Sequence, residues 1–160
     1  MQRIQRRTKS YNVAFSFRPT NFRGGWRNVM HLTTGRNTGW GGRIPAVWTN
    51  GKKLYICGQV NGNTNYCTWS RPMTKNRWYN VRIINGKIGK YYYFRIFVNG
   101  RRIRRVRNSR PRSYNNVKVY LSDPWYPTAY GYLRNLKINL RKYHIFFTFS
   151  NFPFRYLFLR

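Results

Sequence analysis

Apolar and polar residues alternate along most of the chain, which is the pattern of half-buried β-strands. Val13, Phe15 and Phe17 alternate with small or polar residues, so we expect a first strand there. No stretch carries the spacing of a convincing amphipathic helix. Further strands are expected at 28–33, 44–48, 54–57, 78–84, 91–98, 101–106, 117–121 and 130–140. Together these segments make about ten strands.

Asn-Gly pairs punctuate these strands. Asn50-Gly51 predicts a type I′ hairpin, and Asn61-Gly62 predicts the next turn. Asn85-Gly86 and Asn99-Gly100 are expected to end two long strands. Short strands at regular spacing, separated by Gly, Asn and Pro turns, are typical of β-sandwiches and jelly rolls. The predicted fold is therefore all-β, an antiparallel two-sheet β-sandwich.

Two segments depart from simple alternation. Within 101–106, strict alternation would place Ile103 and Val106 on opposite faces, which a β-bulge or a little-buried edge strand would reconcile. The last segment, 142–160, is rich in Phe but has no clean period. It fits an extra strand, an interfacial anchor or, the interpretation we favour, an extension without a selected role. No apolar stretch is long enough for a transmembrane helix.

The length of 160 residues predicts one domain. We expect a basic N-terminal arm at 1–10, a sandwich at 11–140 and an aromatic C-terminal extension at 141–160. The first residues lack the apolar core of a secretory signal peptide.

Charge narrows the possible functions. The chain has 32 Lys and Arg residues against one acidic residue, Asp123, and a formal net charge of +31. This excess favours polyanionic partners. Glycoside hydrolases need two carboxyl groups, and phosphoryl transfer needs a metal-holding acid, so neither activity is expected. His31 lies within a predicted strand and is expected to be structural, and a Cys–His nucleophile using His31 or His144 is not favoured. We therefore predict no enzyme, no cofactor and no metal site.

The two cysteines, Cys57 and Cys67, bracket residues 58–66. A metal site needs about four ligands, and no second Cys or His cluster completes one. A disulfide across a hairpin is the prediction, and it implies an oxidising compartment. Two free thiols in a reducing cell are the alternative.

A set of short runs occurs in a familiar order between residues 11 and 140. The runs are 28–35, 42–48, 54–57, 65–67, 97–100, 116–125 and 132–136. Together they resemble the laminin-G-like, concanavalin A-type jelly-roll domains of extracellular animal proteins. The resemblance implies two facing antiparallel sheets with ligand sites on loops at one rim. It also implies binding of glycans or protein partners, sometimes through calcium. Gly42 stands where relatives commonly place Asp, and one Asp is too few for calcium.

The candidate ligand-binding residues are cationic and aromatic. Guanidinium groups match sulfate and phosphate oxygens in pairs, although such a strand also serves as a charged edge that resists aggregation. Flat aromatic side chains stack on sugar rings or bases, or else cap the core. Asp123, which precedes Pro124, is expected to order its own loop. The candidates are Arg101, Arg102, Arg104, Arg105, Arg107, Arg110 and Arg112, with Trp40, Trp125 and Tyr126.

These observations predict a non-catalytic, extracellular binding or adhesion module that recognises glycans or a partner protein. The net charge of +31 favours an anionic ligand. One alternative is sequence-indifferent binding of nucleic acid, since no helix-turn-helix, zinc-finger or RNP motif is present. The other is a drifted domain without an evolved function.

Overall fold

The computed structural model describes the backbone at residues 2–4, 9–139, 144–147 and 152–153, and side chains at 9–139. Every regular element in this part of the chain is a β-strand. One sheet has six strands in the spatial order β1 (Gln2–Ile4), β10 (Val117–Tyr120), β3 (Trp26–Thr33), β4 (Ala46–Asn50), β5 (Lys53–Val60) and β6 (Asn63–Trp69). The other follows the order β12 (His144–Phe147), β11 (Gly131–Asn139), β2 (Tyr11–Pro19), β7 (Tyr79–Ile88), β8 (Tyr91–Val98) and β9 (Arg101–Arg107). β13 (Phe152–Pro153) also pairs with β11, which makes this sheet seven-stranded.

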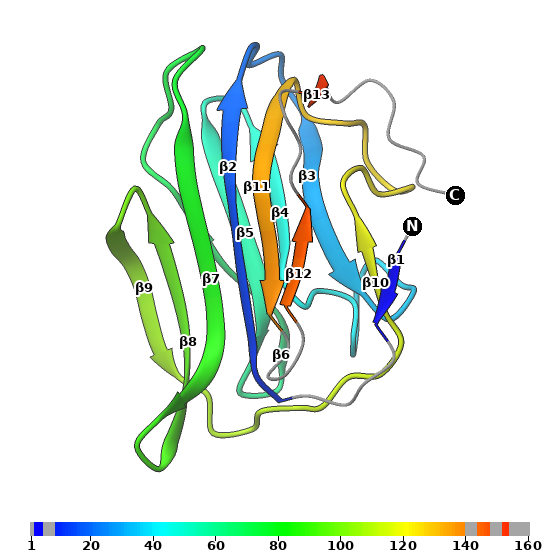
Figure 1. The fold of residues 1–160 in the computed structure, drawn as a ribbon, viewed down its shortest axis with the longest axis vertical. Helices are drawn as coiled ribbons and strands as arrows, with labels where there is room; N and C mark the ends of the chain where they lie inside the picture. The colour runs from blue at the N-terminus through cyan, green and yellow to red at the C-terminus, as the bar shows by residue number, and fades with distance from the viewer. Residues whose placement is uncertain (1, 5–8, 140–143, 148–151, 154–160) are drawn as a thin grey trace.

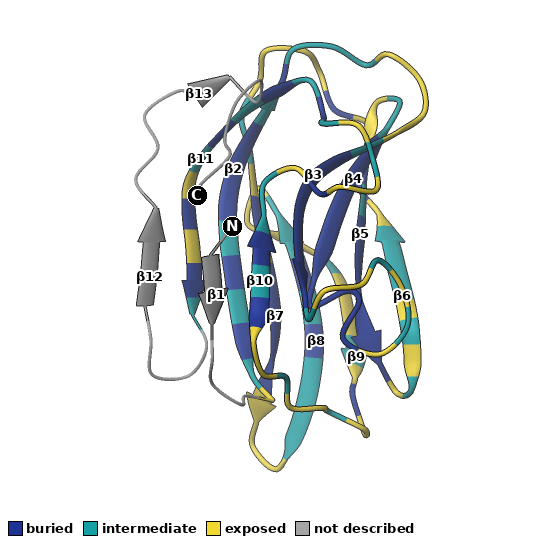
Figure 2. Ribbon diagram, turned by 90° about the vertical axis from the view of Figure 1, so that its right-hand side faces the viewer, coloured by how far each residue is buried: buried dark blue, intermediate teal, exposed yellow. Residues whose placement is uncertain are grey.

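The two sheets lie face to face as the layers of a sandwich (Figure 1), and the side view shows buried residues along the strands of both sheets (Figure 2). The apolar residues that alternate along each strand supply the core, because successive side chains point to opposite faces. Phe17 and Phe94 come from one sheet, Leu32 and Ile56 from the other, and all four have no exposed surface. The predicted antiparallel two-sheet β-sandwich is confirmed.

Two Asn-Gly turns follow the prediction. Asn61 and Gly62 have φ of 54° and 90°, and Asn99 and Gly100 have φ of 49° and 76°. A type I′ hairpin needs positive φ at both central residues, which Asn and Gly tolerate. These turns therefore pair Val60 with Asn63 and Val98 with Arg101, and a bulge farther along each hairpin shifts the register by one residue.

The other two Asn-Gly predictions need correction. Asn50 pairs with Lys53, so the central residues of that hairpin are Gly51 and Lys52, with positive φ at Gly51 alone. This is the pattern of a type II′ turn. Asn85-Gly86 does not end a strand, because β7 continues to Ile88.

Buried hydrogen bonds explain why Asn85 stays inside the strand. Its amide nitrogen donates to the Lys9 carbonyl at 2.7 Å, and its amide oxygen accepts from Asn108 at 3.1 Å. An Asn whose amide is held in this way no longer competes for a turn.

The β-bulge expected in the arginine-rich strand is present. The pairing of β8 with β9 shifts between Ile96 and Phe97, which leaves Ile103 as the extra residue of β9. Ile103 and Val106 consequently both pack against the core. β9 is also the edge strand of its sheet, so both predicted explanations hold together.

The ends of the chain extend the sheets where they are described. β1 pairs antiparallel with β10, and β12 pairs antiparallel with β11. The extra-strand interpretation of the tail fits these short segments, whereas the rest of 141–160 lies outside the described residues. The domain boundaries at 10 and 140 stay predictions. Within the described part, no helix is long and apolar enough to cross a membrane.

Candidate functional site

The outward side of the six-stranded sheet carries a second, smaller cluster of packed apolar side chains around Trp48 and Cys57. In β5, Leu54 and Ile56 enter the core, so the alternation turns Tyr55 and Cys57 outward. Cys57 lies directly opposite Cys67 and is joined to it by the predicted disulfide, with the Cα atoms 4.1 Å apart. The disulfide is thereby confirmed, and it implies an oxidising compartment.

A buried ion pair joins this face to a distant loop. His31 Nδ1 lies 2.8 Å from Asp123 Oδ2, both side chains are fully buried, and His31 Nε2 contacts the Gly42 carbonyl. A carbonyl only accepts, so Nε2 donates to Gly42, while Nδ1 faces the carboxylate of Asp123. His31 is therefore a buried sheet residue with partners on both ring nitrogens, as expected.

Asp123 also orders its own loop, as expected. Its Oδ1 accepts from the backbone nitrogens of Trp125 at 3.1 Å and Tyr126 at 2.9 Å. The turn lays the Trp125 ring 5.3 Å from His31 and the Tyr126 ring 5.7 Å from Trp48, measured between centroids. The two predicted aromatic candidates therefore cap this face, with Trp125 still 37% exposed.

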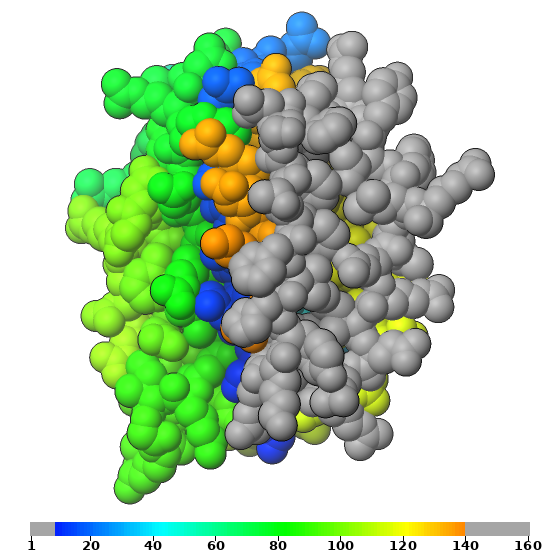
Figure 3. All heavy atoms as spheres, in the orientation of Figure 1, coloured from blue at the N-terminus to red at the C-terminus, as the bar shows by residue number. Residues whose placement is uncertain are grey.

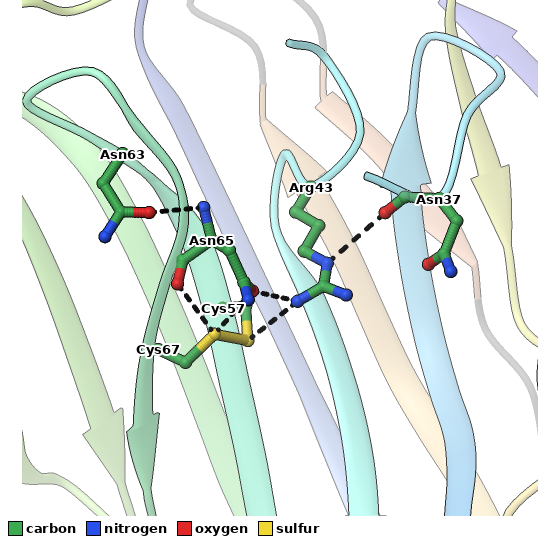
Figure 4. Close-up of a disulfide and its surroundings, with 6 residues drawn as sticks. All are labelled: Asn37, Arg43, Cys57, Asn63, Asn65 and Cys67. Atoms are coloured by element: carbon green, nitrogen blue, oxygen red, sulfur yellow. Dashed lines mark hydrogen bonds between the residues drawn. A yellow bond between two sulfur atoms is a disulfide. The ribbon is translucent and has the colours of Figure 1, made fainter. Parts of the chain in front are cut away.

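Arg43 is a buried residue of this face that sequence reasoning missed. Its guanidinium lies 4.6 Å from the Trp48 ring centroid and donates to Asn65 Oδ1, and Nε donates to the Asn37 carbonyl at 3.3 Å. Figure 4 shows it reaching the disulfide, where Nη1 is 3.8 Å from Cys57 Sγ. Burial lowers the pKa of Arg43, while nearby Tyr and Asp oxygens raise it.

Three further aromatic residues were missed: Trp26, Tyr55 and Trp69, which we call the aromatic surface. Their ring centroids lie 4.4–5.6 Å apart. Trp26 is 39% exposed and Trp69 is 44% exposed. The predicted disulfide was the sequence signal that could have placed Tyr55 next to Trp69 on β5 and β6. Once Cys57 faces Cys67, Tyr55 must face Trp69 two residues along.

Trp40, another predicted candidate, lies in an open hollow near the ends of the strands. The Arg112 guanidinium stacks over its ring at 4.7 Å, so an aromatic candidate and a residue of the cationic stretch come together. Polar groups surround them. The lining residues are Thr34, Trp40, Gly41, Arg112, Ser113, Tyr114 and Asn115. Burial raises the pKa of Tyr114 to about 12, so its hydroxyl stays protonated and donates to Gln59 Oε1.

The outer face of the seven-stranded sheet is cationic. Figure 3 views the molecule from this side, with β7, β8 and β9 in green. Arg95 of β8 lies directly opposite Arg105 of β9. Burial lowers the pKa of Arg95, and three neighbouring positive charges lower it further. These neighbours are Arg82, Arg105 and Arg102, and with Arg95 they form what we call the arginine cluster.

The bulge divides the predicted arginine stretch. Arg102 and Arg105 join the arginine cluster, together with two arginines that were not predicted. Arg104 instead stacks on Tyr66 at 5.0 Å and donates from Nε to its hydroxyl at 2.6 Å. Arg107 stacks on Tyr91 at 3.8 Å. Arg101 is exposed at the start of β9, and Arg110 is exposed in the following loop.

The described residues contain no group of three or more His, Cys, Asp or Glu that could hold a metal ion. Both oxygens of Asp123, the one acidic side chain of the sequence, already accept hydrogen bonds. A free carboxylate for acid–base work is therefore missing from the candidate surfaces.

Solved structures with the same architecture exist. A heptameric SAP-like pentraxin from Limulus polyphemus superposes with a TM-score of 0.57 at 14% identity, over 86% of this chain and 66% of that one. The binding domain of botulinum neurotoxin serotype G gives 0.57 at 12% identity, over 86% of this chain and 35% of that one. The chain has a concanavalin A-like jelly-roll fold. This confirms the resemblance noted in the sequence at the level of fold.

The chain spans less than two thirds of either structure, and these identities carry the fold alone. No protein-family model and no curated protein matches the chain. The concanavalin A-like fold thus supplies the framework, and any function has to be argued from the two outer faces.

Proposed function

We propose that this protein is a non-catalytic module that binds an anionic glycan through the outer face of its seven-stranded sheet. The observation that carries the proposal is the arginine cluster. Like charges on directly paired positions destabilise a sheet, and Arg95 faces Arg105 across β8 and β9. A ligand that brings negative charge removes this repulsion.

The chemistry of the cluster favours sulfate and carboxylate groups. Guanidinium groups bind such anions with paired hydrogen bonds. Neighbouring rings stack on arginines of this sheet: Arg105 of the cluster lies 4.5 Å from the Tyr93 centroid, and Arg134 of β11 lies 3.9 Å from the Trp78 centroid. Stacking limits the rotamers that must be ordered when a ligand binds.

The fold and the disulfide favour a glycan over a nucleic acid. A disulfide persists in oxidising spaces outside the cytosol. The polyanions of those spaces are chiefly acidic glycans. We therefore place the module outside the cell, as part of a secreted or surface protein. A module of this kind acts by holding its partner, and one acidic side chain in the whole sequence supports a function without catalysis.

The test is titration calorimetry with a sulfated polysaccharide and with duplex DNA, each at about 0.1 M and 0.5 M salt. We expect Arg95→Gln with Arg105→Gln to weaken glycan binding at least about tenfold, because two bidentate contacts are lost. The matched control is Lys75→Gln with Arg77→Gln, which removes the same charge from exposed positions elsewhere. It should change affinity by less than about threefold.

Two outcomes would decide against the proposal. If both double variants lose affinity equally, net charge alone drives binding and the arginine cluster is no site. If DNA binds more tightly than the glycan at both salt concentrations, with a slope set by the phosphates neutralised, the nucleic-acid alternative replaces the glycan.

A further inference from the structure

The aromatic surface lies on the sheet opposite the arginine cluster, and its geometry is unusual for surface side chains. Trp26 belongs to β3 and Trp69 to β6, which are three strand spacings apart, about 14 Å. Their ring centroids are nevertheless 5.6 Å apart, inclined by 31°. Both indoles therefore extend toward each other across the outer face of β4 and β5, and each contacts the Tyr55 ring.

This arrangement fixes a pre-formed aromatic platform. Tyr55 contacts both indoles, at 5.0 Å from Trp26 and 4.4 Å from Trp69. Each ring restrains the others, so little side-chain entropy remains to be lost on binding. Trp26 and Trp69 are both more than a third exposed, so part of the platform is open to a ligand.

We propose that the aromatic surface binds a pyranose ring of a glycan chain by stacking, in a manner that needs no charge on the ligand. The apolar C–H face of a sugar ring covers an aromatic ring, and its hydroxyls point outward to polar neighbours. The sheet supplies such neighbours: Trp26 pairs with Asn50, and Asn50 pairs with Lys53. The inference goes beyond the proposed function, because that function rests on anion binding at the other sheet.

The composition of the exposed apolar residues favours a sugar over a protein or a membrane. Five large apolar side chains are prominently exposed among the described residues, and four of them are Trp. A stable protein interface buries about 800 Å² on each partner, far more than three rings offer. Surfaces that insert into lipid combine aromatic with aliphatic side chains, and Ile88 is the single aliphatic member. It lies on β7, in the other sheet.

Charge argues against a second copy of this chain as the occupant. Two molecules of formal charge +31 repel each other strongly, and a platform of three rings offers little area to offset that repulsion. The guanidinium groups of the arginine cluster, which would hold a nucleic-acid backbone, belong to the other sheet. An uncharged sugar ring is not repelled by the positive charge of the chain, and it does not need the guanidinium groups of the other sheet.

The experiment titrates the full chain with neutral hexasaccharides of glucose, mannose, galactose, xylose and N-acetylglucosamine, and with oligothymidylate. The buffer contains about 1 M NaCl, where the screening length is about 3 Å and exposed charges contribute little. Binding is read by calorimetry and by the fluorescence of the indoles. We expect at least one saccharide to bind saturably, because stacking survives salt.

Variants assign the binding to the surface. Trp69→Ala and Trp26→Ala should each weaken it at least about tenfold, whereas Trp69→Phe, which keeps a flat ring, should retain it within about threefold. Ile88→Ala and the double variant Arg95→Gln with Arg105→Gln should leave it unchanged. Thermal melts establish that each variant is folded.

Three results would overturn the inference. The first is that no saccharide binds at high salt, and the second is that binding survives Trp69→Ala. The third is that oligothymidylate binds with the same Trp dependence while no sugar does, which would make the platform a base-stacking surface. If neutral saccharides do not bind the aromatic surface, anion binding by the arginine cluster is unaffected. If the sulfated polysaccharide does not bind the arginine cluster, sugar stacking on the aromatic surface is unaffected.

Discussion

The two outer faces of the sandwich use the same residue type in opposite ways. On the six-stranded sheet, Arg43 is buried, stacks on Trp48 and donates to the oxygens of Asn37 and Asn65. On the seven-stranded sheet, Arg95 is half-buried among like charges, and its Nε has no hydrogen-bond partner among the described residues. On the six-stranded sheet the polar groups of the outer face hydrogen-bond to one another. On the seven-stranded sheet the positive charges of the arginine cluster have no negative partner among the described residues. Unbalanced charge costs stability, so its retention favours a role in binding.

The strongest challenge to this comparison is Asp123→Ala. The substitution leaves buried His31 without its acceptor and frees the backbone nitrogens that hold Trp125 and Tyr126. Removing one partner of a buried pair costs about 3–5 kcal/mol, and we expect that loss in urea unfolding.

A double-mutant cycle supplies the control for this pair. His31→Gln combined with Asp123→Asn should cost less than the sum of the single variants, because the two side chains contact each other directly. A loss below about 1 kcal/mol for Asp123→Ala would show that the face does not depend on the pair.

Loss of the disulfide should have the next largest effect. Cys57→Ala with Cys67→Ala releases a loop of ten residues' separation and should lower the free energy of unfolding by roughly 3 kcal/mol. Because Tyr55 and Trp69 pair two residues away, the near-ultraviolet circular dichroism of the aromatic surface should weaken as well. Without reductant, the wild-type mass should be lower by two hydrogen atoms, and free thiols would refute the bond.

The sequence was sufficient for features set by neighbouring residues. Alternation located the strands, and Asn61-Gly62 set the two-residue turn that joins Val60 to Asn63. It also anticipated that Asp123 orders its own loop, because that hydrogen bonding spans only two or three residues. Local chemistry decides each of these features.

Features set by distant contacts were missed for a physical reason. His31 and Asp123 are 92 residues apart in sequence, and no local pattern pairs them. Asn85-Gly86 failed as a turn because Asn108, from another part of the chain, holds its side chain. Arg95 joined the arginine cluster only through the register of two strands and a bulge. Tertiary pairing overrides local preference in each case.

Arg43→Met separates packing from charge on the outer face of the six-stranded sheet. Methionine keeps much of the volume over Trp48 but loses the hydrogen bonds to Asn37 and Asn65 and the cation–π contact. We expect a loss of about 1.5–3 kcal/mol in urea unfolding, because hydrogen bonds from charged donors contribute in this range. An unchanged midpoint would show that Arg43 is as dispensable as a surface arginine.

The same substitution at Arg95 should have the smallest effect and the opposite sign. Arg95→Met removes a charge that faces Arg105 and is desolvated by its surroundings, so stability should rise by about 0.5 kcal/mol, the size of one cross-strand charge contact. Affinity for the sulfated polysaccharide should fall at the same time. Urea unfolding at low and high salt provides the check, since screening should erase the gain. A variant that is less stable at both salt concentrations would mean that Arg95 supports the sheet, and the contrast between the two faces would then be lost.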